Sequence, residues 1–323
     1  MTADPTRILD IATGYMASKQ LFNAARIGLF RAIAEGAHSP AEVAAATEHP
    51  ERQVRILLDG AAAAGLLNRA DGHYVLADDA AEYLTGGERD LSAFLNFLEK
   101  GSFEAFGHYR HTVDADEGGT LDFDEAGWGM FMAGVMQYNG LHAHWFGEKF
   151  PTSGPISVLD FGGFTAGWSI ELAKRNPELT SRMVYPAESG PMLTPEIEAA
   201  GLSDRIAVEA GETATAVPGG AHDLILAVHV IHRFTDEQNR RILKNLRASA
   251  KADAKLALFD FFLDSLPTQR ELDARHAAEY FNFDGTIVWP EETVASWLED
   301  AGWRFNEYVD VPGSPRVLVA TAA

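Results

Sequence analysis

The most constraining stretch of this sequence runs from Val158 to Gly167 and reads VLDFGGFTAG. Its apolar start predicts a buried strand, the small residues predict a tight turn, and the residues from Trp168 onward predict a helix. A glycine-rich turn between strand and helix lets a nucleotide-type ligand approach backbone N–H groups at the helix N-terminus. The stretch therefore predicts a doubly wound α/β domain whose ligand site opens at this turn.

Composition excludes several function classes. The chain has 323 residues, enough for one large or two medium domains, and carries 47 acidic against 26 Lys and Arg residues. The resulting net charge of −21 argues against nucleic acid or an anionic membrane as a partner. Because cysteine is absent, disulfides, thiolate nucleophiles and zinc–sulfur sites are excluded. Without a signal-peptide pattern or a bilayer-length apolar run, we expect a cytoplasmic protein.

Apolar periodicity divides the chain into three predicted parts. Helices followed by a hairpin at Ala70-Asp71-Gly72 indicate a winged helix, and the scarcity of basic residues favours a dimerisation module over DNA binding. Residues 88–150 are predicted to be helical and aromatic, with a loop at 114–127. From residue 156 strands and helices alternate, and the chain ends in a hairpin, which predicts a mostly parallel sheet with an antiparallel finish. The predicted domains are 1–100 (winged helix), 101–150 (helical connector) and 151–323 (Rossmann-like α/β domain).

In this order the parts resemble the small-molecule O-methyltransferases that use S-adenosylmethionine (SAM). The resemblance covers nearly the whole chain and rests on VLDFGG with the following IELAKRNP, on AGLSDRI, on AGE, and on IHRFTDE leading into RILKNL. It implies a class I methyltransferase domain after a winged-helix dimerisation domain, a homodimer, a small-molecule substrate, and SAM lying across the glycine-rich turn.

The resemblance also implies site residues. His232 falls where the family has its general base, and Arg233 and His229 are further catalytic candidates beside it. The cofactor-binding candidates are Asp160, Gly162, Gly163, Phe164, Tyr185, Gly211 and Glu212. The substrate-binding candidates are Met132, Met136, Tyr138, Asn139, His276, Tyr280 and Phe283. Core packing, or a buried amphipathic helix, is the alternative interpretation of this last set.

The sequence departs from the family pattern at the cofactor site. Phe164 and Ala166 replace two glycines, and Tyr185 falls about where an acid normally accepts hydrogen bonds from the ribose. Arg233 replaces a residue that is commonly acidic or His, and residues 251–254 lack the usual Pro-Gly-Gly turn. Each lost polar contact costs roughly 1–3 kcal/mol, so we expect SAM affinity to fall by several orders of magnitude, with no other cofactor in its place.

Three hypotheses for function follow. The first is a family enzyme acting on a small aromatic or polyketide-like molecule by SAM-independent acid–base chemistry (isomerisation, cyclisation, elimination or decarboxylation) at His232. The second is a working SAM-dependent O-methyltransferase with a remodelled site, and the third is a non-catalytic pseudoenzyme or ligand sensor. A metal site at His229 and His232 is not expected, because alternate residues of a strand point to opposite faces.

Overall fold

The computed structural model describes residues 3–264 and 269–323, which form two compact units. The first unit holds the residues up to Glu104 together with Phe123–Tyr138, and the second holds Ala105–Asp122 and the residues from Asn139 onward. Residues 101–150, which we expected to form a separate connector, are thus divided between the units, and the three-part division stays a prediction.

The first unit is helical, with one small hairpin, as predicted. Pro40 opens its third helix, and Ser39 caps that helix by accepting from the Glu42 N–H while the Glu42 carboxylate accepts from the Ser39 N–H. The elements of this part of the chain are α1 Thr6–Arg26, α2 Leu29–Ala34, α3 Pro40–Thr47, α4 Glu51–Ala63, β1 Leu67–Ala70, β2 His73–Leu76, α5 Asp78–Tyr83, α6 Ser92–Phe97, the π-helical turn Leu98–Ser102, α7 Phe103–Ala105 and α9 Glu125–Lys149, of which the residues from Asn139 belong to the second unit.

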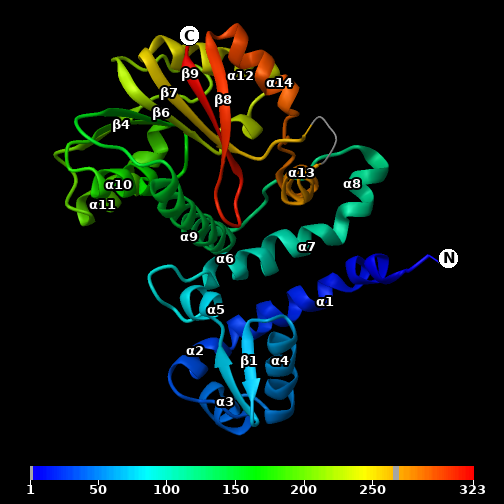
Figure 1. Ribbon diagram of the computed structural model, residues 1–323. Coiled ribbons are helices and arrows are strands. Elements are labelled where there is room, and N and C mark those ends of the chain that lie inside the picture. The colour runs from blue at the N-terminus through cyan, green and yellow to red at the C-terminus, as the bar shows by residue number, and fades with distance from the viewer. Residues whose placement is uncertain (1–2, 265–268) are drawn as a thin grey trace. The chain divides into compact units, whose positions relative to one another are not determined.

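The second unit is built on a seven-stranded sheet (Figure 1) with the order β5-β4-β3-β6-β7-β9-β8. The strands are β3 Ser157–Phe161, β4 Thr180–Tyr185, β5 Ile206–Ala210, β6 His222–Val228, β7 Ala250–Asp260, β8 Trp303–Asp310 and β9 Arg316–Ala322. The first five are parallel, and β9 runs antiparallel to both of its neighbours, so the predicted antiparallel finish is confirmed. The strand order reverses between β3 and β6, which is where ligands bind in sheets of this kind.

Helices complete the second unit. They are η2 Phe106–His108, α8 Tyr109–Ala115, α10 Gly167–Arg175, η3 Ala187–Ser189, α11 Gly190–Ala199, η4 Ile231–Arg233, α12 Asp236–Ala248, α13 Glu271–Asp284 and α14 Glu291–Asp300. β6 ends at Val228, although the apolar run in the sequence continues through Ile231, and α11 begins at Gly190. Within the described residues, no helix is long and apolar enough to cross a membrane.

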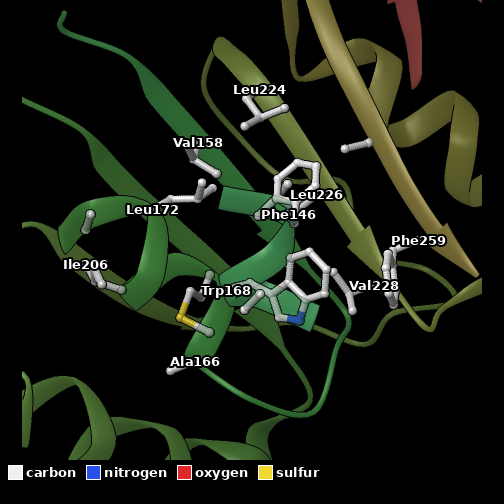
Figure 2. Packing of buried hydrophobic residues seen from close by; sticks show 14 of the residues in the cluster. Phe146, Val158, Ala166, Trp168, Leu172, Ile206, Leu224, Leu226, Val228 and Phe259 are labelled. Atoms are coloured by element: carbon white, nitrogen blue, oxygen red, sulfur yellow. The ribbon is translucent and has the colours of Figure 1, made fainter. Parts of the chain in front are cut away.

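Alternating side chains along the strands form two cores. Val158, Leu224, Leu226 and Phe259 pack on one face with Phe146 of α9 and Trp168 of α10 (Figure 2), and Leu159, Ile225 and Leu258 pack on the other with α12 and α14. Since both faces are covered, the parallel strands are apolar throughout and expose mainly their carboxyl ends to ligands.

Candidate functional site

Four neighbouring strands end at one edge of the sheet, and polar residues gather there. Asp160 lies near the end of β3, Tyr185 ends β4, and Asp260 ends β7. After β6 the chain makes the short helical turn η4, which carries His232. The carboxyl ends of parallel strands meet at the same edge, so these residues share one site.

The turn that carries His232 is held from beneath by Asn239, a fully buried residue of α12. The Asn239 amide donates to the carbonyls of Ile231 and Phe234, at 2.9 and 3.0 Å. The Trp289 indole N–H also donates to the Ile231 carbonyl, at 3.1 Å. These bonds fix both ends of a three-residue turn, and they limit the positions open to the His232 ring.

His232 is paired with the carboxylate of Asp260. The His232 Nδ1 atom lies 3.1 and 3.0 Å from the two Asp260 oxygens, and the side chains are 8% and 1% exposed. Burial alone would raise the pKa of Asp260, but the charge and hydrogen bond of His232 bring it below its usual value. A carboxylate at Nδ1 leaves Nε2 as the proton-accepting atom, the arrangement of a general base. The Tyr280 ring lies beside the imidazole, with 4.6 Å between centroids.

His229 lies within reach of the same pair. Its backbone has a φ of 52°, in the left-handed region that non-glycine residues seldom occupy. His229, His232 and Asp260 each offer one atom that could bind a metal ion, and these three atoms lie within 4.8 Å of one another. The argument from strand alternation was therefore wrong here, since β6 ends before His229. Burial lowers the pKa of His229 to about 3, so this ring stays neutral.

Asp160 and Tyr185 bind each other below the glycine-rich turn. The Tyr185 hydroxyl donates to Asp160 Oδ1 at 2.9 Å, and Ser169 donates to Asp160 Oδ2 at 2.7 Å. Burial raises the pKa of Asp160 to about 6, against the lowering effect of these hydrogen bonds. Tyr185 is itself buried, so the expected hydrogen bond from a ligand to its hydroxyl is replaced by an internal one.

The turn itself is shaped by its own packing. Gly162 has a φ of 71°, and a Cβ there would lie 2.5 Å from Thr213. A Cβ at Gly163 would lie 3.0 Å from the Tyr185 hydroxyl, and one at Gly211 would lie 2.8 Å from Val184. These glycines are thus required by close packing around the turn, whatever ligand it binds.

Arg233 reaches from η4 back to this turn. One of its Nη atoms donates to the Gly162 carbonyl, and the guanidinium lies over the Phe164 ring, 4.5 Å from the centroid. Phe164 therefore belongs to neither of the two cores, and its ring instead makes a cation–π contact with Arg233. Burial lowers the pKa of Arg233 to about 10, which leaves it positively charged at neutral pH.

Comparison with known proteins assigns the chain to a family. Residues 140–308 match the family described as a methyltransferase domain, and residues 9–86 match the O-methyltransferase dimerisation domain. The chain belongs to the methyltransferase family. The methyltransferase fold and the O-methyltransferase resemblance are both confirmed by these matches.

Two relatives and one solved structure illustrate the range of this methyltransferase family. A 3-hydroxy-5-methyl-1-naphthoate 3-O-methyltransferase of Streptomyces sahachiroi is 28% identical over 80% of this chain and 78% of its own length. An L-tyrosine C(3)-methyltransferase of Streptomyces lavendulae is 26% identical over 84% and 80%. The structure of CalO1, a methyltransferase in calicheamicin biosynthesis in its SAH-bound form, superimposes with a TM-score of 0.86 over the whole of both chains at 18% identity, which shows the shared fold.

The methyltransferase domain places the expected substrate residues differently. Tyr280 lies beside His232, whereas His276 stacks on Phe261 at 3.9 Å and bonds through Nδ1 to the Leu272 carbonyl. The Asn139 side chain accepts a hydrogen bond from the Trp168 indole at 3.4 Å. Phe283 is 9% exposed. Met132, Met136 and Tyr138 belong to the first unit, and their role in substrate binding stays a prediction.

Sequence reasoning missed the groups that orient the candidates. Asp260, Asn239 and Ser169 were not singled out, although all three are buried polar residues with specific partners. A signal existed for Asp260, because it is the acid that ends an apolar strand next to the one before His232. Asn239 and Ser169 lie in amphipathic helices and carry no comparable signal.

The site fits SAM only in part. No carboxylate stands at the end of β4 to accept hydrogen bonds from the ribose, since Tyr185 takes that place and turns inward. Asp160 is fully buried and already accepts two hydroxyl donors. Among the described residues, charged groups at or near the turn include the exposed Glu212 carboxylate, the Arg233 guanidinium, and the Glu196 carboxylate, which accepts from the Ala166 N–H at 3.2 Å.

Proposed function

We propose that this protein is an enzyme that removes a proton from a hydroxyl group of a small molecule, with His232 as the base. The His232–Asp260 pair carries this proposal, because it fixes the ring and directs Nε2 away from the carboxylate. Asp260 stabilises the imidazolium that forms when the proton is taken up. General-base catalysis of this kind contributes about 10²- to 10⁴-fold in rate.

The reaction that we propose after deprotonation is methyl transfer. The names of both relatives support a phenolic aromatic substrate, one methylated on oxygen and the other on C(3) of tyrosine. Loss of the phenolic proton makes the oxygen, and the ring carbon beside it, more nucleophilic, so one base can serve either outcome. SAM, when bound, would supply the electrophilic methyl group, and Glu212 and Arg233 are the residues that we expect to hold it.

A second candidate is the SAM-independent acid–base reaction. The contact of Arg233 with Gly162 and Phe164 favours it, because a buried guanidinium repels the sulfonium cation of SAM. In that case His232 would hold the substrate proton and return it to another atom of the same molecule. The comparisons support methyl transfer more strongly, so this candidate comes second, and a non-catalytic sensor comes third.

Calorimetric titration with SAM and with S-adenosylhomocysteine separates the candidates. Micromolar binding, followed by transfer of a labelled methyl group to a panel of phenols, is expected for the first candidate. His232→Asn should keep that binding and lose the transfer. Absence of binding at millimolar ligand, with turnover of phenols in the absence of SAM, would replace the first candidate by the second.

We also propose that the protein is a homodimer that assembles through its N-terminal residues. The match of residues 9–86 to a dimerisation domain supports this. Exposed apolar residues of α1, among them Ile8 at 68% and Ile11 at 74% exposed, provide a surface that a second copy would cover. Light scattering of the full chain tests it, since a monomer at micromolar concentration would contradict the proposal. A cytoplasmic location stays a prediction.

A further inference from the structure

Among the described residues, no carboxylate forms an ion pair with Arg233, although the charge of Asp260 acts on it. Its Nη atom donates to an uncharged carbonyl, that of Gly162, and its guanidinium faces the rings of Phe164 and Phe234, at 4.5 and 5.5 Å from their centroids. Its Nε atom is buried and has no hydrogen-bond partner among the described residues. Among the described residues, one other arginine atom is buried without a hydrogen-bond partner, Nε of Arg316. Arg316 differs from Arg233 because it forms ion pairs with three carboxylates.

This arrangement is unfavourable for the protein alone. A buried charge normally requires a partner of opposite charge, and an orphaned N–H costs roughly 1–3 kcal/mol. The acid whose charge acts on Arg233 is Asp260, and its carboxylate is hydrogen-bonded to His232. The two aromatic rings stabilise the cation, but they accept no in-plane hydrogen bond, so Nε has no acceptor among the described residues.

Other groups around Arg233 allow an anion to approach. The residues whose charges act on it are Asp260, Tyr185 and Tyr280. Burial raises the pKa of Tyr185 well above its usual value, so this phenol is neutral. The neighbouring His229 is also neutral. Gly162 and Gly163 pack closely against Thr213 and Tyr185, and the Gly162 carbonyl accepts from the guanidinium.

We propose that Arg233 is the binding residue for a carboxylate group of a ligand at the turn Gly162–Phe164. A carboxylate would accept from the fork of guanidinium N–H groups, including the orphaned Nε, and would neutralise the buried charge. The carboxylate can come from two sources, which are the amino-acid end of SAM and an aromatic acid that serves as substrate. This inference does not depend on methyl transfer, because either source satisfies Arg233.

Calorimetry with paired probes tests the proposal and separates the sources. The probes are SAM against decarboxylated SAM, which lacks only the carboxylate, and salicylate against salicylamide. If SAM is the source, wild-type protein should bind SAM about tenfold or more tighter than its decarboxylated form, and Arg233→Gln should abolish that difference. If the substrate is the source, the same pattern should hold for salicylate over salicylamide.

Arg233→Lys is the matched variant, because it keeps the charge and loses the fork. We expect it to retain part of the preference for the carboxylate form, while thermal denaturation confirms that both variants fold. Equal affinity of the wild type for both members of each pair, or no binding of any probe at about 10 mM, would overturn the proposal. A protein that prefers salicylate through Arg233 but transfers no methyl group would refute methyl transfer and leave this inference intact.

Discussion

His232 Nδ1 lies 3.0 Å from an oxygen of Asp260, across the ends of the neighbouring strands β6 and β7. The carboxylate selects the tautomer in which Nδ1 carries the proton and Nε2 is basic. Asp260→Asn should remove this selection while it preserves the shape of the side chain. We expect turnover to fall by about 10²-fold or more with little change in substrate affinity.

Nitrogen NMR of the His232 ring provides a readout that needs no substrate. In Asp260→Asn the ring should shift toward the tautomer protonated on Nε2. Asp223→Asn is the control. The Asp223 carboxylate also accepts a hydrogen bond and forms an ion pair, but it lies near the start of β6, away from the turn that carries His232. Unchanged turnover together with an unchanged tautomer in Asp260→Asn would contradict the role given to this pair.

Asn239→Ala should loosen the turn that carries His232. The substitution removes the donors to the Ile231 and Phe234 carbonyls, and only the first of these keeps another donor, from Trp289. We expect a loss of about 1–3 kcal/mol in the free energy of unfolding, measured by urea denaturation, with lower turnover. Asn245→Ala, which removes one bond to a carbonyl from the same helix, should cost less. An equal loss in both variants would show that the turn has no special dependence on Asn239.

The fold could be predicted from the sequence because its signals are local. The apolar strand, small-residue turn and helix around Gly162 follow one another directly in the chain, and Ser39 and Pro40 mark a helix start by their own chemistry. The end of a strand or helix is harder to predict where apolar residues continue past it. The apolar run that forms β6 continues through Ile231, although the strand ends at Val228 and η4 begins at Ile231.

The site could be predicted only where its residues lie next to such signals. His232 follows a buried strand directly, but its partner Asp260 lies 28 residues further along the chain. Tyr185 ends β4, but only tertiary contacts decide that its hydroxyl turns inward to Asp160. The Arg233 contact with Gly162 spans 71 residues and satisfies no local pattern, so no periodicity or spacing could have predicted it.

Phe146→Ala should destabilise the second unit strongly. The ring is fully buried and packs against Trp168 at 5.4 Å and Phe150 at 5.1 Å between centroids (Figure 2 shows the first pair). We expect a loss of about 3–5 kcal/mol in the free energy of unfolding from lost burial and the cavity left behind. Phe305→Ala is the control, since this ring is 45% exposed and should cost much less. Similar losses would mean that α9 does not pack on the sheet as described.

Asp160→Asn should change how stability depends on pH. The folded-state pKa of Asp160 is raised to about 6 by burial, above its value of roughly 4 in an unfolded chain. Between these two values the folded state holds a proton that the unfolded state has lost, so stability falls as pH rises through this range. A shift of about two units corresponds to on the order of 3 kcal/mol, complete above pH 6.

In Asp160→Asn that part of the decline should vanish, because the amide cannot titrate. Its oxygen can accept from the Tyr185 hydroxyl and its NH2 group can donate to the Ser169 oxygen, whose own O–H can donate to Ser181. Urea denaturation at pH 5 and pH 7.5 measures the difference for the wild type and the variant. Asp204→Asn, at an exposed position, should keep the wild-type slope. A variant whose stability declines over this range as steeply as that of the wild type would show that another group titrates there and that Asp160 is ionised at pH 5.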